Sequence, residues 1–278
     1  MRYELKGLLL ACAVLGGTAM AQSPPTGEVK GQAWQHTDQS LAAAIAQATL
    51  VLPASVTGTT VFSGRFADAP PTRARVTTVL FLHGSSGLGL KAIGEWQLWL
   101  ASLGVASMAP DSFALPDRIT YTSPVAVDIY EHIHDLRASE IRAGLAALRK
   151  TAWADPNRLI LAGASEGAVA VARYPGREFA GRIVYSWSCE PNYFVTAPRN
   201  AFAADEPVLN VISAVDPYFS SSNAWLGNPA ARGHCADALR DDKRAVIVLI
   251  PGAPHTLLNL PAARDATAAL LATLTRAP

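Results

Sequence analysis

The chain lacks the features that mark several large classes of protein. Only 16% of its 278 residues are charged, the 23 basic and 22 acidic residues nearly balance, and no run of Lys or Arg stands out. Such a chain has no electrostatic footprint for nucleic acid or for an anionic membrane surface. It has no internal repeat or low-complexity tract, and its three cysteines lack the nearby histidine pairs of a zinc site. We therefore expect no nucleic-acid partner and no metal.

The first 21 residues have the pattern of a secretory signal peptide. Arg2 and Lys6 precede a short apolar run over 8–15, and an A-x-A cleavage site ends at Ala21. The run is too short to span a bilayer easily, and no later segment approaches the roughly 20 apolar residues that a span needs. Acylation at Cys12 is an alternative, which the very short run before it disfavours. We expect a soluble mature protein, periplasmic or secreted.

Cysteine usage fits an exported protein. Removal of 21 residues leaves 257, with two basic residues and one acidic residue lost and 21 of each sign remaining. Cys189 and Cys235 are then the cysteines left, and in an oxidising compartment they predict one disulfide. It would join the loop after one strand to the loop after the next. Two separate buried thiols are the alternative.

Short apolar runs alternate with helical patterns through most of the mature chain. This is typical of βα units around a largely parallel sheet, and the length suits one large α/β domain. We expect strands over 59–66, 77–82, 105–109, 159–162, 183–187, 208–213 and 245–250. Helices are expected over 40–50, 95–103, 127–150 and 262–276, and a turn over 155–158. Residues 22–58 form an N-terminal extension with edge elements, and 59–278 form the main domain.

The segment 158–171 reads as a strand, a tight turn and a helix. The turn carries G-x-S-x-G as Gly163-Ala-Ser165-Glu-Gly167. A serine can be exposed at the tip of a strained strand-to-helix turn only if its neighbours are small, and the two glycines supply that room. The sequence therefore predicts that Ser165 is a nucleophile. An ordinary serine in a glycine-rich βα turn is the alternative.

A serine hydroxyl needs a base and the base needs a carboxylate. His255 follows the last expected strand, and an imidazole of ordinary pKa near 6.5 is the usual base. Asp216 follows the preceding strand and begins a Pro turn. The chain order Ser165, Asp216, His255 is that of the nucleophile-elbow hydrolases. Asp205 is the fallback for the carboxylate.

Two backbone N–H groups are expected to form an oxyanion hole. One belongs to Glu166, at the start of the helix after the elbow, and the other to Ser85 in the His83-Gly-Ser-Ser-Gly loop, with Ser86 as its competitor. His83 is expected to orient this loop and to transfer no proton. The Glu166 side chain would oppose the developing charge if it pointed inward, so we expect it to pair with an arginine such as Arg173 or to reach a backbone donor.

Aromatic residues gather in the loops that follow the later strands. Loops at the carboxyl ends of parallel strands line the cleft in such sheets, which favours an apolar or aromatic acyl pocket. Substrate contacts are expected from Trp187, Tyr218 and Phe219, with Tyr193, Phe194 and Trp225 nearby. Ordinary core packing is the alternative for each of them.

Taken together, these segments resemble the dienelactone hydrolase-like branch of the α/β-hydrolase superfamily. The resemblance covers about 59–275 and rests on 81–89, 109–113, 137–158, the elbow at 163–167, 215–217 and 254–255. It implies an α/β-hydrolase fold, with a mostly parallel central sheet flanked by helices, and a catalytic domain over 59–278. A dienelactone hydrolase proper has a cysteine where Ser165 stands and is cytoplasmic, so the sequence favours a general exported ester hydrolase.

The sequence thus predicts an exported serine hydrolase that cleaves carboxylic esters through an acyl-enzyme, acts on a small-molecule ester and needs no cofactor. A peptidase or an acyltransferase could use the same triad. A catalytically silent hydrolase fold that serves as a binding protein is the alternative from another class, and Glu166 is the feature that hints at it.

Overall fold

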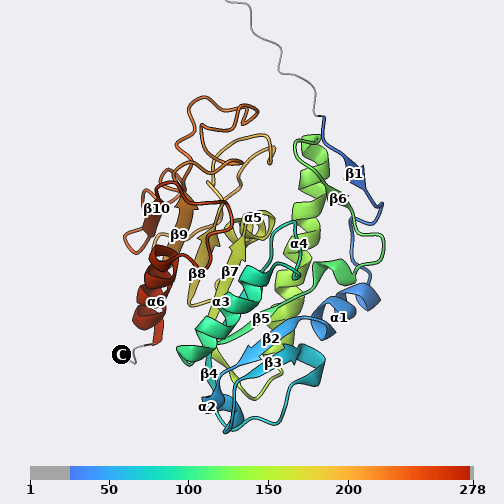
Figure 1. Ribbon diagram of the computed structural model, residues 1–278, viewed down its shortest axis with the longest axis vertical. Coiled ribbons are helices and arrows are strands. Elements are labelled where there is room, and N and C mark those ends of the chain that lie inside the picture. The colour runs from blue at the N-terminus through green and yellow to red at the C-terminus, as the bar shows by residue number, and fades with distance from the viewer. Residues whose placement is uncertain (1–25, 276–278) are drawn as a thin grey trace, which may run out of the picture.

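A computed structural model describes residues 26–275 of the chain. The expected signal peptide, its cleavage site and the alternative acylation site at Cys12 lie outside the described residues. Within them, a central sheet runs through the molecule with helices on both faces (Figure 1). No helix in the described part of the chain is both long and apolar enough to cross a membrane.

The central sheet has eight strands in the order β10-β9-β8-β7-β4-β5-β2-β3. From β10 to β5 all neighbours are parallel, whereas β2 is antiparallel to both β5 and β3. The bounds are β2 Thr49–Leu52, β3 Phe62–Arg65, β4 Val76–Leu82, β5 Ala106–Ala109, β7 Ala154–Ala164, β8 Gly181–Tyr185, β9 Val208–Ser213 and β10 Val246–Ile250. A separate ribbon pairs β1 Val29–Lys30 with β6 Thr120–Tyr121. The largely parallel sheet inferred from the alternating runs is confirmed.

The sheet separates two hydrophobic cores, and strand β4 shows how. Side chains alternate across a strand, so Leu80 and Leu82 enter one core while Val79 and Phe81 enter the other. The first core is covered by α1, α4 and α5, and the second by α3 and α6. The helices are α1 Asp38–Ala46, α2 Ala54–Thr57, α3 Lys91–Ser102, α4 Val127–Leu148, α5 Glu166–Arg173 and α6 Pro261–Thr275, with 3-10 turns η1 Phe66–Asp68 and η2 Ser112–Ala114.

Two local expectations need correction. The helix expected over 40–50 ends at Ala46, and β2 begins at Thr49 with a strand on either side of it. Leu50 and Leu52 are fully buried, so this short apolar run gains more from pairing inside the sheet than from extending the helix. The turn expected over 155–158 lies within the span of β7, where the register against β4 shifts between Val76 and Thr78. Residues 155–158 therefore interrupt the pairing between β7 and β4 and do not form a separate turn before the strand.

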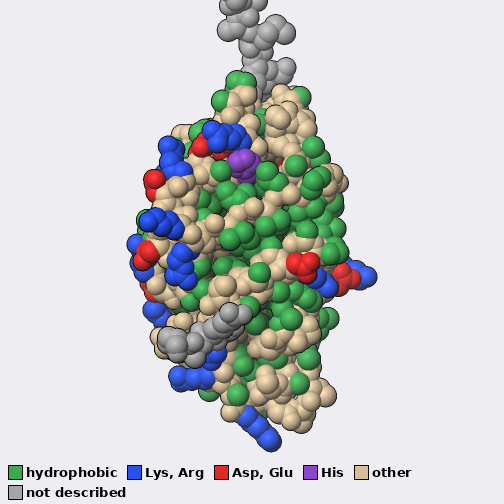
Figure 2. Space-filling view, turned by 90° about the vertical axis from the view of Figure 1, so that its left-hand side faces the viewer, with side chains coloured by type: hydrophobic (Ala, Val, Ile, Leu, Met, Phe, Trp, Pro, Cys, Tyr) green, Lys and Arg blue, Asp and Glu red, His purple; other side chains and the backbone are tan. Residues whose placement is uncertain are grey.

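Strand β10 lies at one edge of the sheet, on the side of the molecule that Figure 2 turns toward the viewer. Hydrophobic side chains gather at the centre of this face. Val246 and Leu249 of β10, whose side chains point to opposite faces of the strand, are 51% and 42% exposed, and no described strand pairs with the outer edge of β10.

Candidate active site

Ser165 occupies a sharp turn between β7 and α5. Its backbone has φ 52° and ψ −117°, which is a region that a residue with a Cβ rarely adopts. Its N–H donates to the Tyr185 carbonyl of β8, 3.0 Å away, and this bond ties the turn to the sheet. The side chain makes no capping hydrogen bond to α5. The hydroxyl therefore lies at the carboxyl end of β7 and makes no hydrogen bond to the start of α5.

The two glycines of the elbow are required by close contacts. A Cβ on Gly167 would lie 2.3 Å from the Leu82 carbonyl oxygen, and one on Gly163 would lie 2.7 Å from the Gly167 carbonyl oxygen. Both distances are far inside van der Waals contact. The motif therefore lets α5 begin directly against β4 and β7, as the sequence pattern predicts.

His255 and Asp216 lie together at the carboxyl ends of neighbouring strands. His255 Nδ1 is 2.7 Å from Asp216 Oδ2. Asp216 is fully buried, and its Oδ1 accepts the N–H groups of Tyr218 and Phe219 at 2.9 and 3.1 Å. These bonds fix the carboxylate so that it faces the imidazole. The fallback Asp205 instead pairs with Arg177 at the surface, 3.4 Å away, and contacts no part of His255 in the described structure.

The loop that carries His255 is tied to two strand ends. Ser186, just after β8, donates to the His255 carbonyl at 2.6 Å, and Ser213 at the end of β9 donates to the Ala253 carbonyl at 2.6 Å. His255 and Ser165 border the same cavities. No hydrogen bond joins the Ser165 hydroxyl to the imidazole in the described structure, and such bonds are often long before substrate binds.

The His83-to-Gly87 loop lies beside the elbow. A Cβ on Gly84 would lie 3.3 Å from the Cβ of Ser165, so the loop backbone packs closely on the serine. The N–H groups of Ser85 and Ser86 donate to no acceptor among the described residues, and both side chains border the cavity. The first N–H groups of α5 have no acceptor within the helix. The geometry thus provides unpaired backbone donors around Ser165, with both Ser85 and Ser86 available.

His83 is bound entirely within the protein. Its Nδ1 lies 2.7 Å from the Gly84 carbonyl, and its Nε2 accepts the Ser112 N–H at 3.2 Å. Arg137 donates to the His83 carbonyl at 2.9 Å. Burial lowers the pKa of His83 well below its usual value, and the Arg137 charge lowers it further. A neutral, fully bonded imidazole fits the role expected for it, which is to fix the loop.

The Glu166 side chain turns away from the cavity into a buried ionic cluster. Its Oε1 pairs with Arg118 at 2.6 Å and lies 3.7 Å from Arg137 Nε, and its Oε2 accepts the Tyr121 hydroxyl at 3.1 Å. Burial alone would raise the pKa of Glu166, but the charges of Arg118 and Arg137 hold that pKa below its usual value. Glu166 is therefore an anion whose charge is neutralised locally.

The prediction that Glu166 pairs with Arg173 is wrong, because Arg173 binds Glu131 on α4 through two hydrogen bonds of 2.7 and 3.1 Å. Sequence reasoning also missed Arg118, Arg137 and Tyr121. No spacing along the chain relates these positions to Glu166, because they come from a loop, from α4 and from β6. Only the packing of these elements behind the elbow brings them together.

A cavity of about 340 Å³ opens over Ser165. Tyr218 and Phe219, the expected substrate contacts, border it together with Tyr193 and Phe194. Trp187 does not border it in the described structure. It is fully buried, and its ring meets that of Phe219 edge-on at 4.9 Å between centroids. Trp187 thus belongs to the packing behind the cavity.

The expected disulfide between Cys189 and Cys235 is confirmed. It joins the loop after β8 to the loop after β9, across a sequence separation of 46 residues.

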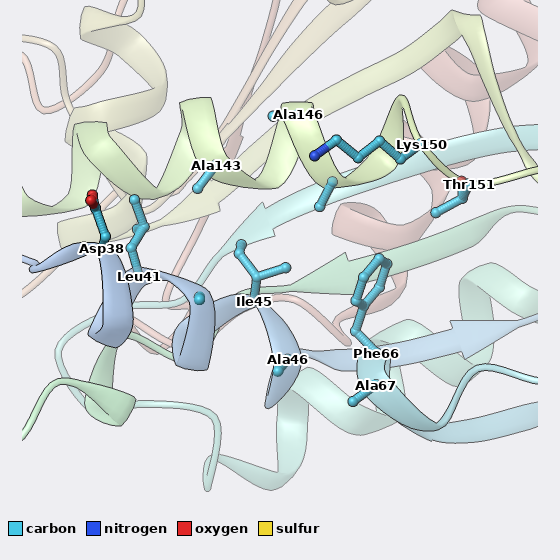
Figure 3. A pocket seen from close by; sticks show the side chains of 12 residues that line it. Asp38, Leu41, Ile45, Ala46, Phe66, Ala67, Ala143, Ala146, Lys150 and Thr151 are labelled. Carbon is cyan, nitrogen blue, oxygen red and sulfur yellow. The ribbon is translucent and has the colours of Figure 1, made fainter.

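A larger hollow of about 690 Å³ lies between α1, α4 and η1. Figure 3 shows its lining, in which Leu41, Ile45 and Phe66 face alanines of α4, with Lys150 at one side. None of the described residues that line it is a serine, cysteine or histidine. The smaller cavity, which holds Ser165 and His255, is therefore the candidate active site.

Comparison with solved structures identifies the fold. A protein described as a dienelactone hydrolase from Klebsiella pneumoniae aligns with a TM-score of 0.53 and 18% identity over 73% of this chain and 88% of its own. TT1662 from Thermus thermophilus aligns with a TM-score of 0.52 and 19% identity, over 83% and 99%. Est1E from Butyrivibrio proteoclasticus aligns with a TM-score of 0.50 and 16% identity, over 82% and 94%.

No protein-family model and no curated protein sequence matches the chain. The likeness in three dimensions, with the mostly parallel sheet and flanking helices, shows an α/β-hydrolase fold.

Proposed function

We propose that the protein is a serine hydrolase that cleaves carboxylic esters. The observation that carries the proposal is the 2.7 Å contact between His255 Nδ1 and Asp216 Oδ2, together with a cavity that Ser165 and His255 share. The strained backbone of Ser165 is a second support, because such strain clusters at functional sites. The fold comparison supplies the architecture, and the reaction is inferred from the site.

In the proposed mechanism His255 Nε2 takes the proton of the Ser165 hydroxyl while the oxygen attacks the ester carbonyl. The N–H groups of Glu166 and Ser85 donate to the oxyanion. The His255 imidazolium, stabilised by Asp216, then protonates the leaving alcohol, and an acyl-Ser165 ester forms. Water repeats the sequence with the same base, releases the carboxylic acid and restores the serine.

Buried charge near the oxyanion would work against this mechanism unless it were balanced. Glu166 is an anion next to the nucleophile in sequence, and the positive charges of Arg118 and Arg137 offset its negative charge. The elbow can therefore carry an acidic residue directly after the serine. Glu166 was the feature that hinted at a catalytically silent binding protein. That hint no longer applies if Glu166 forms part of a buried ionic cluster with Arg118 and Arg137.

The proposal is tested with purified protein and p-nitrophenyl acetate. Ser165→Ala should reduce kcat by at least about 10³-fold, because removal of the nucleophile leaves only binding and the oxyanion donors. Ser102→Ala, on the exposed end of α3, is the matched control and should keep full activity. A fluorophosphonate probe should label Ser165 in the wild type. Undiminished turnover by Ser165→Ala would refute the proposal.

We also propose that the protein is exported to the periplasm or secreted. The basic and apolar pattern over 1–21 supports this, as does a disulfide of the kind that persists in oxidising compartments. The check is the N-terminal sequence of the protein recovered from the expressing cells, which should begin at Gln22. Recovery of the intact chain from the cytoplasm would contradict it.

A further inference from the structure

Two hollows meet at Ser165, and they differ in size and lining. The smaller measures about 50 Å³, and its lining includes Ala164, Leu257 and Leu258 but no described tyrosine. This space is much smaller than the larger hollow, so a short group fits it better than a long chain. The larger hollow measures about 340 Å³, near the lower end of the range for small-molecule sites. The smaller hollow suits a short acyl group, and the larger one suits the alcohol.

The larger hollow is rich in hydroxyl groups. Nine of its twelve lining residues are Ser, Thr or Tyr, among them Ser86, Thr122, Tyr193 and Tyr218. The hydroxyls of Thr122 and Tyr218 make no hydrogen bond to another described residue, so both can bind a ligand. A hydroxyl both donates and accepts, which suits a partner that is itself rich in hydroxyls. Phe194 and Phe219 add aromatic surface to the same wall.

Among the described residues, the lining contains no Lys, Arg, Asp or Glu. Arg118 is the nearby candidate for binding a substrate carboxylate, but it is 5% exposed and its guanidinium is already engaged. It donates to Ser112 at 2.7 Å, to the Ile119 carbonyl at 2.9 Å and to Glu166 at 2.6 Å. Each of its three nitrogens thus already donates to an acceptor within the protein, and Arg118 does not border the cavity among the described residues. The site therefore favours an uncharged substrate.

We propose that the natural substrate is a short-chain ester, an acetate or propionate, of an uncharged polyhydroxylated alcohol such as a sugar ring. This inference rests on the proposed esterase function. The Ser165 oxygen forms a bond to the acetyl carbon, and the bond from that carbon to the sugar oxygen breaks. The sugar oxygen takes a proton from His255. Water, deprotonated by His255, then attacks the acetyl-serine and releases acetate and the restored hydroxyl.

The alcohol preference is tested by comparing a methyl glucoside acetylated at its primary hydroxyl with cyclohexylmethyl acetate. The two have the same ring size and ester but differ in ring hydroxyls. The expected result is at least a tenfold higher kcat/KM for the sugar ester. Tyr218→Phe should lower that ratio about fivefold, as loss of one neutral hydrogen bond would do. Tyr174→Phe is the matched control, since its hydroxyl binds Glu178 at 2.9 Å outside the cavity, and should leave the ratio unchanged.

The acyl preference is tested with p-nitrophenyl acetate and hexanoate, where the acetate should be favoured at least tenfold. Three outcomes would overturn the inference. The first is hydrolysis of p-nitrophenyl acetate with no preference for the sugar ester, which leaves the esterase function intact. The second is faster hydrolysis of the hexanoate. The third is no hydrolysis of any ester, which removes the proposed function as well.

Discussion

Ser165 should make the protein less stable than glycine would at the same position. At φ 52° and ψ −117° its Cβ is in a sparsely populated region, which costs about 1–3 kcal/mol. Glycine adopts such angles without that cost but loses about 0.5–1 kcal/mol through the greater freedom of its unfolded chain. No capping bond from the side chain is lost, because Ser165 makes none. The net expectation is that Ser165→Gly raises the free energy of unfolding by about 1 kcal/mol.

The comparison variant is Ser165→Ala, which also lacks the hydroxyl but keeps the Cβ and therefore the strain. Urea unfolding at neutral pH should place Ser165→Gly about 1 kcal/mol above Ser165→Ala, which for a chain of this size corresponds to a melting temperature about 2–4 °C higher. Ser139→Gly in the middle of α4 is the control for glycine itself and should lower stability. If Ser165→Gly is no more stable than Ser165→Ala, the strain argument is refuted.

Two further predictions concern buried and half-buried charge. Arg118→Met should lower the free energy of unfolding in urea by about 3 kcal/mol, because it leaves the buried Glu166 carboxylate without its closest partner. Adding Glu166→Gln should restore part of that loss. If the effects of the two substitutions simply add, the pairing is contradicted. Burial alone would raise the pKa of Glu131, but hydrogen bonds from Arg173 and the Thr196 N–H lower it to about 2. The stability that ionised Glu131 contributes is thus complete above the unfolded pKa near 4.5 and is lost as pH falls toward 2. Between pH 6 and 3.5 the free energy of unfolding of the wild type should fall by about 1.4 kcal/mol relative to that of Glu131→Gln. A difference between the two proteins that does not change with pH would contradict this.

Local chemistry explains why much of the sheet was predictable. The strand over 208–213 has the expected bounds, and the runs before Ser165 and His255 differ from expectation only at their ends. All three are short apolar runs. The run over 208–213 is buried along its whole length, whereas β10 lies partly exposed at the edge of the sheet, and both keep the apolar pattern that predicts a strand in a parallel sheet. The β2 run was missed because its alanine-rich approach favours helix, and only pairing with β5 and β3 decides otherwise.

The sequence by itself determined the elbow. G-x-S-x-G between a strand and a helix requires small residues, and the contacts of Gly163 and Gly167 show why. The order Ser165, Asp216, His255 was also readable, because each follows a strand and parallel strands bring their carboxyl ends to one edge. The contact between His255 and Asp216 fits that expectation.

The partners of Glu166 were decided by tertiary structure alone. Arg118 and Arg137 lie 48 and 29 positions away on separate elements, and nothing along the chain distinguishes them from Arg173. The same holds for the hydroxyl-rich lining of the cavity, where the sequence favoured an aromatic pocket and Trp187 proved to lie behind it. The reason is physical: a backbone turn is set by its own residues, whereas the side chains that meet across a cavity are set by how distant elements pack.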